Sequence, residues 1–177
     1  MAFQNLLMKL YCSIKLAASK IKGSTFYECL DWCPKEKNLF HIVSKETGKP
    51  LLPKFKLMSS DSFFFLNFIN CYEDKDDNGG DVIVIDLIGY DSPNILDQLF
   101  LNKLRSGKLD VKDKSKVMRF VVPFSVASTE NNEGCNLVKG YGKTTAAAVL
   151  EAKKGHVVLS PHLVTPEQGC EHPSINR

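Results

Sequence analysis

The sequence lacks the long apolar run that a transmembrane helix needs. Its 177 residues are 44% hydrophobic and 24% charged, with a formal net charge of +3. No stretch approaches the roughly 20 apolar residues that cross a bilayer as a helix. The small excess of positive charge argues against nucleic acid as a partner, because nucleic-acid-binding surfaces concentrate basic residues. The composition is that of one globular domain with a core.

Common catalytic and phosphate-binding motifs are also missing. No G-x-S-x-G nucleophile motif occurs. The run Gly140–Thr145 has the wrong glycine spacing for a phosphate loop, and it leads into an expected strand. The acidic stretch Asp74–Asn78 misses the alternating ligand spacing of a calcium loop, so a solvated hairpin tip is the better interpretation.

Histidine is scarce, and none of its positions predicts a metal site. The chain contains His41, His156, His162 and His172. His41 alternates with apolar neighbours in an expected strand, which favours a hydrogen-bonded structural histidine. His156 and His162 flank a Ser-Pro break and are near enough in sequence to meet across a turn. Two histidines without a carboxylate remain a weak metal signal.

Cysteine is present in a pattern that favours free thiols. The six residues are even in number but irregular in spacing: Cys12, Cys29, Cys33, Cys71, Cys135 and Cys170. A domain of this size does not need disulfides to supplement its core. We therefore expect free, mostly buried thiols, and with them a reducing, cytoplasmic location.

The first 23 residues combine apolar and basic side chains. On a helix, one face would carry Leu6, Leu7, Leu10, Ile14 and Ala17, with lysines on its flanks. The segment lacks the cleavage site of a secretory signal. Two interpretations are open, a helix packed into the core or a segment that lies on a membrane surface.

From residue 24 onward the pattern predicts an all-β structure. Short apolar runs alternate with polar turns, and we expect strands at residues 26–32, 39–44, 54–58, 63–72, 81–90, 118–125, 144–150 and 156–160. One helix interrupts them, capped by Asp91 or Ser92 and ended by Gly107. Its expected buried stripe is Ile95, Leu96, Leu99, Phe100 and Leu104. This pattern fits either a sandwich or a propeller.

Several runs, in order, resemble the carotenoid cleavage oxygenase family. The family includes the β-carotene-cleaving oxygenases and the retinoid isomerase of the retinal pigment epithelium. The runs are SSDSFFFLNFINCYED (59–74), DVIVIDLIGYDSP (81–93), LFLNKLR (99–105), MRFVVPF (118–124), Asn136–Val138 and Glu171–Asn176. The likeness covers residues 26–177, and FHIVSKETGK (40–49) is closest to insect members.

The resemblance implies a fold and a cofactor that the residue pattern alone does not predict. The fold would be a seven-bladed β-propeller, of which residues 24–177 would form about three blades with one short inserted helix. Four histidines from different blades would hold Fe(II), which suits imidazole ligands and leaves room for dioxygen. The substrate would be a carotenoid or apocarotenoid, cleaved at a double bond into aldehyde products. The apolar start of the chain would correspond to a membrane-contacting stretch at the mouth of the substrate tunnel.

Two site residues follow from the family's motifs. In family members the run after the aromatic residues reads phenylalanine, histidine, a variable residue, isoleucine, asparagine, and that histidine binds iron. This chain has Asn67 at that place, and an amide oxygen is a poor substitute for imidazole on iron. Glu171 matches a glutamate that orients a ligand histidine.

Three functional hypotheses follow from these residues. The chain is part of an Fe(II)-dependent oxygenase and is inactive by itself, because no complete set of ligands lies within it. Alternatively, it is a non-enzymatic relative that binds a carotenoid or retinoid, or a vestigial product without function. A piece of a propeller would also expose strand edges, which predicts poor solubility or marginal stability.

Overall fold

The computed structural model describes residues 32–52, 54–107, 114–124 and 133–165. They belong to two compact units. One unit comprises residues 34–93 and 111–177 and contains the described strands; the other comprises residues 1–33 and 94–110 and contains the described α-helices. No described helix is long and apolar enough to span a membrane.

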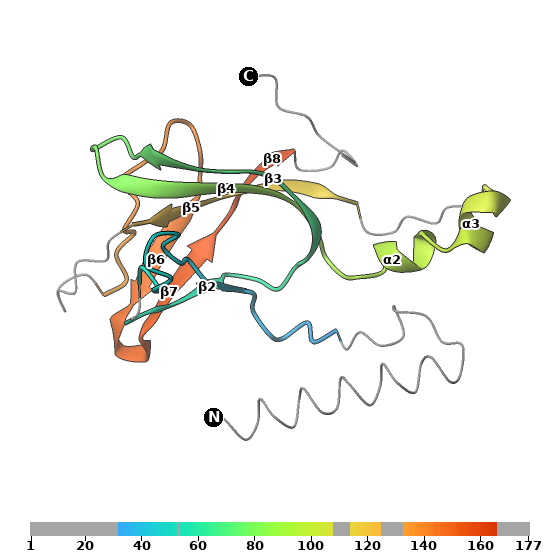
Figure 1. Ribbon diagram of the computed structural model, residues 1–177, viewed down its shortest axis with the longest axis horizontal. Coiled ribbons are helices and arrows are strands. Elements are labelled where there is room, and N and C mark those ends of the chain that lie inside the picture. Colours follow the sequence, from blue (N-terminus) through green and yellow to red (C-terminus); the bar gives the residue numbers. More distant parts are fainter. Residues whose placement is uncertain (1–31, 53, 108–113, 125–132, 166–177) are drawn as a thin grey trace. The chain divides into compact units, whose positions relative to one another are not determined.

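The larger sheet of the β unit is entirely antiparallel. Its strands lie in the order β3-β4-β5-β8: β3 (Phe64–Lys75), β4 (Asp81–Tyr90), β5 (Lys116–Pro123) and β8 (His162–Thr165). Figure 1 shows β3, β4 and β5 as long neighbouring strands. Residues 82–90 of β4 are all buried, as the largely apolar run of an interior strand predicts.

The smaller sheet mixes parallel and antiparallel pairs. Its order is β1-β2-β7-β6, formed by β1 (Leu39–Phe40), β2 (Lys56–Ser59), β7 (His156–Ser160) and β6 (Ala147–Glu151). The pair β2–β7 is parallel. A turn of 3-10 helix, η3 (Ala152–Lys154), joins β6 to β7, and Gly155 ends it with φ +65°, a conformation that glycine adopts without steric cost.

The two sheets share one hydrophobic core. Leu57, Val157 and Leu159 from the smaller sheet and Phe120 from the larger one are 3% exposed or less. The Phe120 ring lies 4.9 Å from the ring of Phe40 and 5.5 Å from that of Phe63. Residues on one face of β6 and β7 are buried at every second position, as expected for strands with one face on the core.

The expected single helix is instead two short ones. They are α2 (Ile95–Gln98) and α3 (Leu101–Ser106). Phe100 has φ −64° and ψ 135°, an extended conformation that breaks the helical ladder between them. The predicted cap and buried stripe were therefore wrong: Asn94 precedes α2, and of the stripe only Ile95 is buried. Gly107 ends α3 as predicted, with φ +65°.

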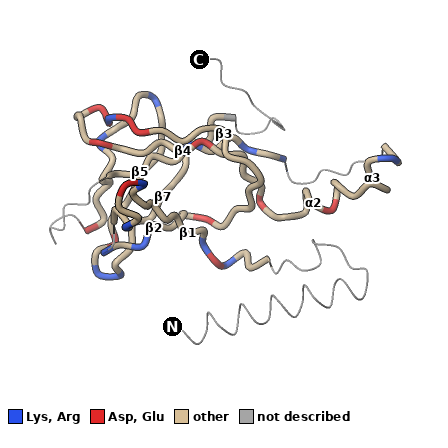
Figure 2. Tube along the Cα trace, viewed as in Figure 1, with Lys and Arg blue, Asp and Glu red and all other residues tan. Residues whose placement is uncertain are grey.

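The acidic turn between β3 and β4 is a hairpin tip that is exposed, as predicted, at every acidic position except Asp76. Asp76 is 9% exposed, and its carboxylate accepts the backbone N–H groups of Gly80 (2.7 Å) and Asn78 (3.0 Å). It also accepts the N–H of Lys139 (3.1 Å), 63 residues away in sequence. Figure 2 shows acidic residues gathered at this end of the β3–β4 pair. The turn thus fastens a remote loop to the sheet.

The all-β class is confirmed. The described residues contain two four-stranded sheets and no closed propeller. Strand β8 was not predicted, because only Pro161 separates it from β7 and its residues look like the end of that strand. The expected strand at 26–32 and the boundary at residue 23 fall outside the described part of the chain.

Candidate functional site

Strand β3 is irregular where it carries Asn67. Phe65 pairs with Gly89 and Phe68 with Leu87, so two residues of β3 lie opposite one of β4. Asn70 then pairs with Asp86, which leaves Ile69 as a second extra residue. Phe68 therefore lies between two β-bulges, and Asn67 lies within the first. Bulges re-aim side chains and are frequent beside active sites.

The bulges turn Phe68 toward the core side of the sheet. Directly opposed residues in antiparallel strands point to the same face, so Phe68 shares a face with Leu87, its partner on β4. In a regular strand it would share the face of its neighbours Leu66 and Asn70, since alternate residues face the same way. The Phe68 ring packs edge-on against Phe65, with centroids 5.2 Å apart.

An apolar groove of about 410 Å³ lies on this face. One wall is the β3 aromatic cluster, which we define as Phe63, Phe65 and Phe68. The floor consists of alternate residues of β4: Ile83, Ile85 and Leu87. The other wall is the segment 38–43. Phe68 remains 60% exposed. The groove therefore offers aromatic and aliphatic surface to a bound apolar molecule, as ligand sites do.

Cys71 lines the same groove, and the structure corrects the expectation about cysteines. Cys33, Cys71 and Cys135 are free, as predicted, but all three are exposed rather than buried. Partial burial, followed by the charges of Asp86 and Glu73, raises the pKa of the Cys71 thiol. Both effects disfavour the thiolate, so this cysteine is not set up as a nucleophile.

On the opposite face, a polar row crosses the sheet. Asn70, Asp86, Arg119 and His162 occupy paired positions on β3, β4, β5 and β8. The Arg119 guanidinium donates to both carboxylate oxygens of Asp86, from Nε at 2.7 Å and from Nη2 at 2.8 Å. These hydrogen bonds raise the pKa of Arg119. The ion pair thus ties β4 to β5 at the level where β3 resumes its pairing with β4 at Asn70.

A tyrosine pair extends this face toward the β3–β4 turn. The Tyr141 hydroxyl donates to Asp74 Oδ2 (2.5 Å) and lies 3.2 Å from the hydroxyl of Tyr72. Burial and these contacts raise the pKa of Tyr141, whereas the hydrogen bond lowers that of Asp74. A hydroxyl held this way keeps its proton and serves to position the loop.

Two backbone N–H groups of the loop around Tyr141 are already occupied by carboxylates of the same chain. The N–H groups of Lys139 and Gly142 already donate to the carboxylates of Asp76 and Asp77. A phosphate-binding loop needs such N–H groups free to cradle the anion. Carboxylates of the same chain occupy that role here.

The described histidines are apart from one another. His41 is exposed and lies after β1 rather than within a strand, contrary to prediction. His156 begins β7 and His162 begins β8. The backbone N–H of Thr145 donates to His162 Nδ1 at 3.2 Å. Among the residues described, no three His, Cys, Asp or Glu side chains are grouped so as to hold a metal ion.

Of the predicted site residues, only Asn67 lies in the described part of the chain, where it is exposed on β3. Glu171 and the apolar face at Leu6, Leu7, Leu10 and Ile14 fall outside it. Sequence patterns had no signal for the two bulges, because inserted residues keep the same strand composition. The Asp86–Arg119 pair was also missed, although a lone Asp inside an apolar strand is a recognisable sign of a buried partner.

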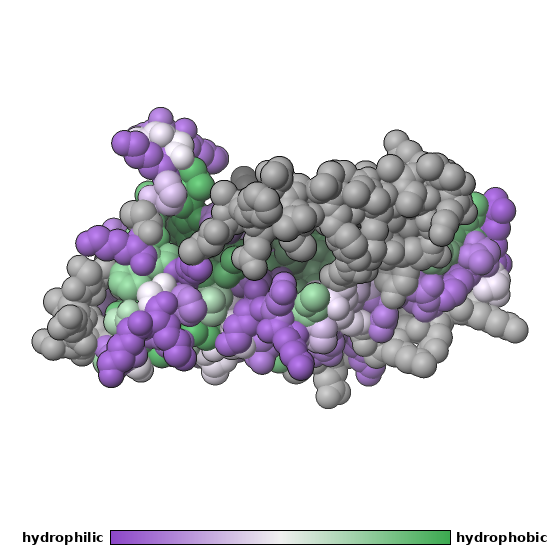
Figure 3. Space-filling view, turned by 90° about the horizontal axis from the view of Figure 1, so that it is seen from below, coloured by the Kyte–Doolittle hydropathy of each residue, from purple (hydrophilic) through white to green (hydrophobic). Residues whose placement is uncertain are grey.

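Apolar side chains are also exposed around the groove. Leu39, Val43, Phe65, Leu66 and Phe68 are each between 38% and 60% exposed. The face of the molecule drawn in Figure 3 shows apolar surface among hydrophilic side chains. Extended apolar surface of this kind marks a place where a ligand or another polypeptide binds.

Comparison with known proteins places this sheet and groove in a family. A family model described as retinal pigment epithelial membrane protein matches residues 5–177. A rat β,β-carotene 15,15'-dioxygenase is 30% identical over 92% of this chain and 27% of its own length. A mitochondrial carotenoid-cleaving dioxygenase of Macaca fascicularis is 32% identical over 91% of this chain and 29% of its own length. The chain thus spans less than a third of these relatives, and it belongs to the carotenoid oxygenase family.

Proposed function

We propose that this chain is part of an iron-dependent oxygenase that cleaves a double bond of a carotenoid or apocarotenoid to give aldehyde products. The apolar groove beside Asn67 is the observation that carries the proposal. A polyene is long, flat and without charge, and aromatic walls bind such a molecule by burial of apolar area and by ring contacts. The names of the relatives supply the class of substrate.

In this proposal the β3-β4-β5-β8 sheet is one blade of a propeller. Propeller blades are four-stranded antiparallel sheets, and this sheet has that form. The smaller sheet contains a parallel pair and therefore differs from a regular antiparallel blade. That its strands belong to further blades is also part of this proposal. A cytoplasmic location, with residues 3–23 at a membrane surface, belongs to it as well.

The described residues do not by themselves fit an iron centre. An iron site in this family's manner requires several imidazoles on one centre, and no such cluster is present among them. Asn67 offers only an amide oxygen at the expected ligand place. We therefore derive no chemical step through iron, and we expect no oxygenase activity from this chain alone. Its own residues bind the apolar substrate and exclude water from it.

Binding of all-trans-retinol, a fluorescent polyene, tests the groove. We expect Phe68→Asp to weaken retinol binding about tenfold, because it removes apolar contact and places a charge beside the polyene. Leu104→Asp is the matched control, since Leu104 is an exposed leucine (46%) on α3. Equal affinity in both variants would contradict the proposed site.

The full-length transcript and the iron content test the enzyme itself. If the open reading frame continues into further histidine-bearing strands, and the product binds iron and releases aldehyde, the oxygenase proposal stands. In that protein Asn67→His should raise iron affinity. A metal-free protein that retains coloured polyene would instead support a binding protein, the second candidate, which the same groove favours.

A further inference from the structure

A second cavity lies in the β unit. Segment 38–43, which lines the apolar groove, is not part of its lining. It has a volume of about 520 Å³, within the range of small-molecule sites. Its lining comes from the turn after β2, the end of β4, the strand β5 and the β7–β8 junction. Four segments that are distant in sequence thus meet around one space.

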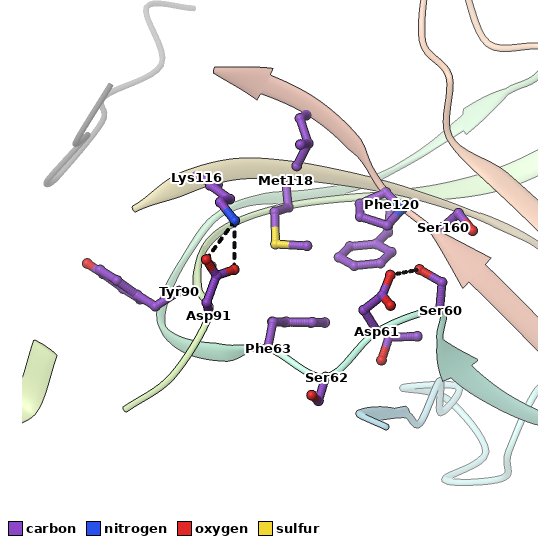
Figure 4. Close-up of a pocket in the computed structure, with 14 residues that line it drawn as sticks. Ser60, Asp61, Ser62, Phe63, Tyr90, Asp91, Lys116, Met118, Phe120 and Ser160 are labelled. Carbon is purple, nitrogen blue, oxygen red and sulfur yellow. Dashed lines mark hydrogen bonds and ion pairs between the residues drawn. The ribbon is translucent and has the colours of Figure 1, made fainter. Parts of the chain in front are cut away.

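The cavity has an apolar middle and two polar ends. Figure 4 shows Phe63 on one side and Met118 with Phe120 on the other. The Phe63 and Phe120 rings are stacked, with centroids 5.5 Å apart. At one end stands the pair Asp91–Lys116, and at the other Asp61 with Ser60. Because the two rings contact each other, a ligand cannot lie between them, and the space that remains beside Met118 and Leu163 suits a small apolar body that carries a polar group at its end.

The charges at the two ends are not equivalent. Lys116 Nζ donates to both oxygens of Asp91, at 2.6 and 2.9 Å, so that ammonium is already neutralised. Asp61 accepts only the Ser60 hydroxyl, at 2.9 Å on Oδ2, and has no cationic partner in the described part of the chain. The charged residues in the lining are two aspartates and one lysine, which leaves one unit of negative charge.

A cavity with net negative charge favours cations. An ammonium group gains from the Asp61 carboxylate. A carboxylate ligand would meet repulsion from Asp61, and Lys116 could compensate only by leaving Asp91. We propose that this cavity binds a small organic ammonium with an apolar body, whose charged nitrogen lies at Asp61. This site shares only Phe63 with the polyene groove, and it does not depend on the proposed oxygenase activity.

Three ligands that share one apolar body test the proposal on the complete chain. They are phenethylamine, phenethyl alcohol and phenylacetate, titrated into isotopically labelled protein and followed by amide chemical shifts. We expect the amine to bind with a Kd of about 1–10 mM, as ligands of this size do. Because Asp61 is exposed to solvent, its attraction for the ammonium is modest, and the amine should bind at least about threefold more tightly than the alcohol. The acid should bind most weakly. Shifts should concentrate at Ser60, Met118 and Ser160.

Two variants separate the role of Asp61 from general charge. Asp61→Asn keeps the shape and an acceptor oxygen but removes the charge, so amine affinity should fall at least about threefold, to that of the alcohol. Asp81→Asn removes the same charge at an exposed site outside the cavity and should change nothing. Equal affinity for amine and alcohol, shifts elsewhere in the protein, or an unchanged amine affinity in Asp61→Asn would each overturn the proposal.

Discussion

At the scale of single residues, the ion pair between Asp86 and Arg119 contributes to the stability of the β3-β4-β5-β8 sheet. Asp86 is 5% exposed, and both of its oxygens accept hydrogen bonds from Arg119. Removal of one partner leaves the other charge buried without compensation, whereas replacement of both by apolar residues avoids that penalty.

We therefore expect Arg119→Met to lower the free energy of unfolding by about 3 kcal/mol. The double variant Asp86→Leu with Arg119→Met should recover at least half of that loss. Urea denaturation of the wild type and of each variant measures this. A double variant as unstable as the sum of both single ones would show that the two side chains act independently.

Two glycines of the Tyr141 loop provide a second, matched comparison. Gly140 and Gly142 both have positive φ, +96° and +56°. A Cβ at Gly140 would lie 2.6 Å from Asp77 Oδ2, whereas one at Gly142 would meet nothing within 4 Å. Both alanine substitutions carry backbone strain of about 1 kcal/mol. We expect Gly140→Ala to cost about 1 kcal/mol more, as measured by thermal unfolding; equal losses would contradict the close approach.

At the scale of elements, the β3–β4 turn acts as a clasp on the loop 139–142. Backbone N–H groups of Gly80 and Lys139 donate to Asp76 and hold the pKa of its carboxyl below the ordinary value of 3.8. A carboxyl with a lower pKa in the folded than in the unfolded state stabilises the fold above its unfolded pKa. That stabilisation is lost as the pH falls through the folded pKa.

The clasp should accordingly open in acid, starting below about pH 4. The amide resonances of Gly80 and Lys139 should shift together as the Asp76 carboxylate takes up its proton, before the strands unfold. Asp76→Asn should abolish the pH dependence of the Gly80 and Lys139 amides. Resonances that stay constant down to the unfolding transition would contradict the clasp.

The sequence predicted the strands well and the local irregularities poorly. Strand β4 was placed to the residue, because its nine consecutive buried positions are apolar or glycine except for Asp86. The sequence predicted one helix where α2 and α3 lie, because nothing in the composition indicates the extended conformation of Phe100 between them. The bulges escaped for a similar reason. The groove could not be predicted at all, since it depends on how segment 38–43 lies over β4.

At the scale of the whole molecule, the chain spans less than a third of the length of the relatives that it matches, and it displays much apolar surface. Strand β3 has no partner on its outer edge among the described strands, and Phe68 beside it is 60% exposed. Unpaired edges and apolar patches promote association.

We expect the isolated chain to self-associate as its concentration rises, through this edge and groove. Phe68→Lys should reduce association, because a charge on an edge strand opposes further pairing. Light scattering over a concentration series measures both. The exposed control Leu104→Lys should have a smaller effect. A soluble monomer with a sharp, reversible thermal transition would contradict the prediction.

The two bulges of β3 compensate each other, because each adds one residue to β3 relative to β4. Before Phe65 and after Asn70 the even-numbered residues of β3 face the same way, since two extra residues together restore the alternation. Only between the two bulges do even-numbered residues, such as Phe68, face the other side of the sheet. Loss of one residue within 66–69 would invert half of the strand, and would set either the polar row or the core residues on the wrong face. Loss of two would spare both halves and cost the molecule only the aromatic wall at Phe68, so length variation at this point in related chains should come in steps of two.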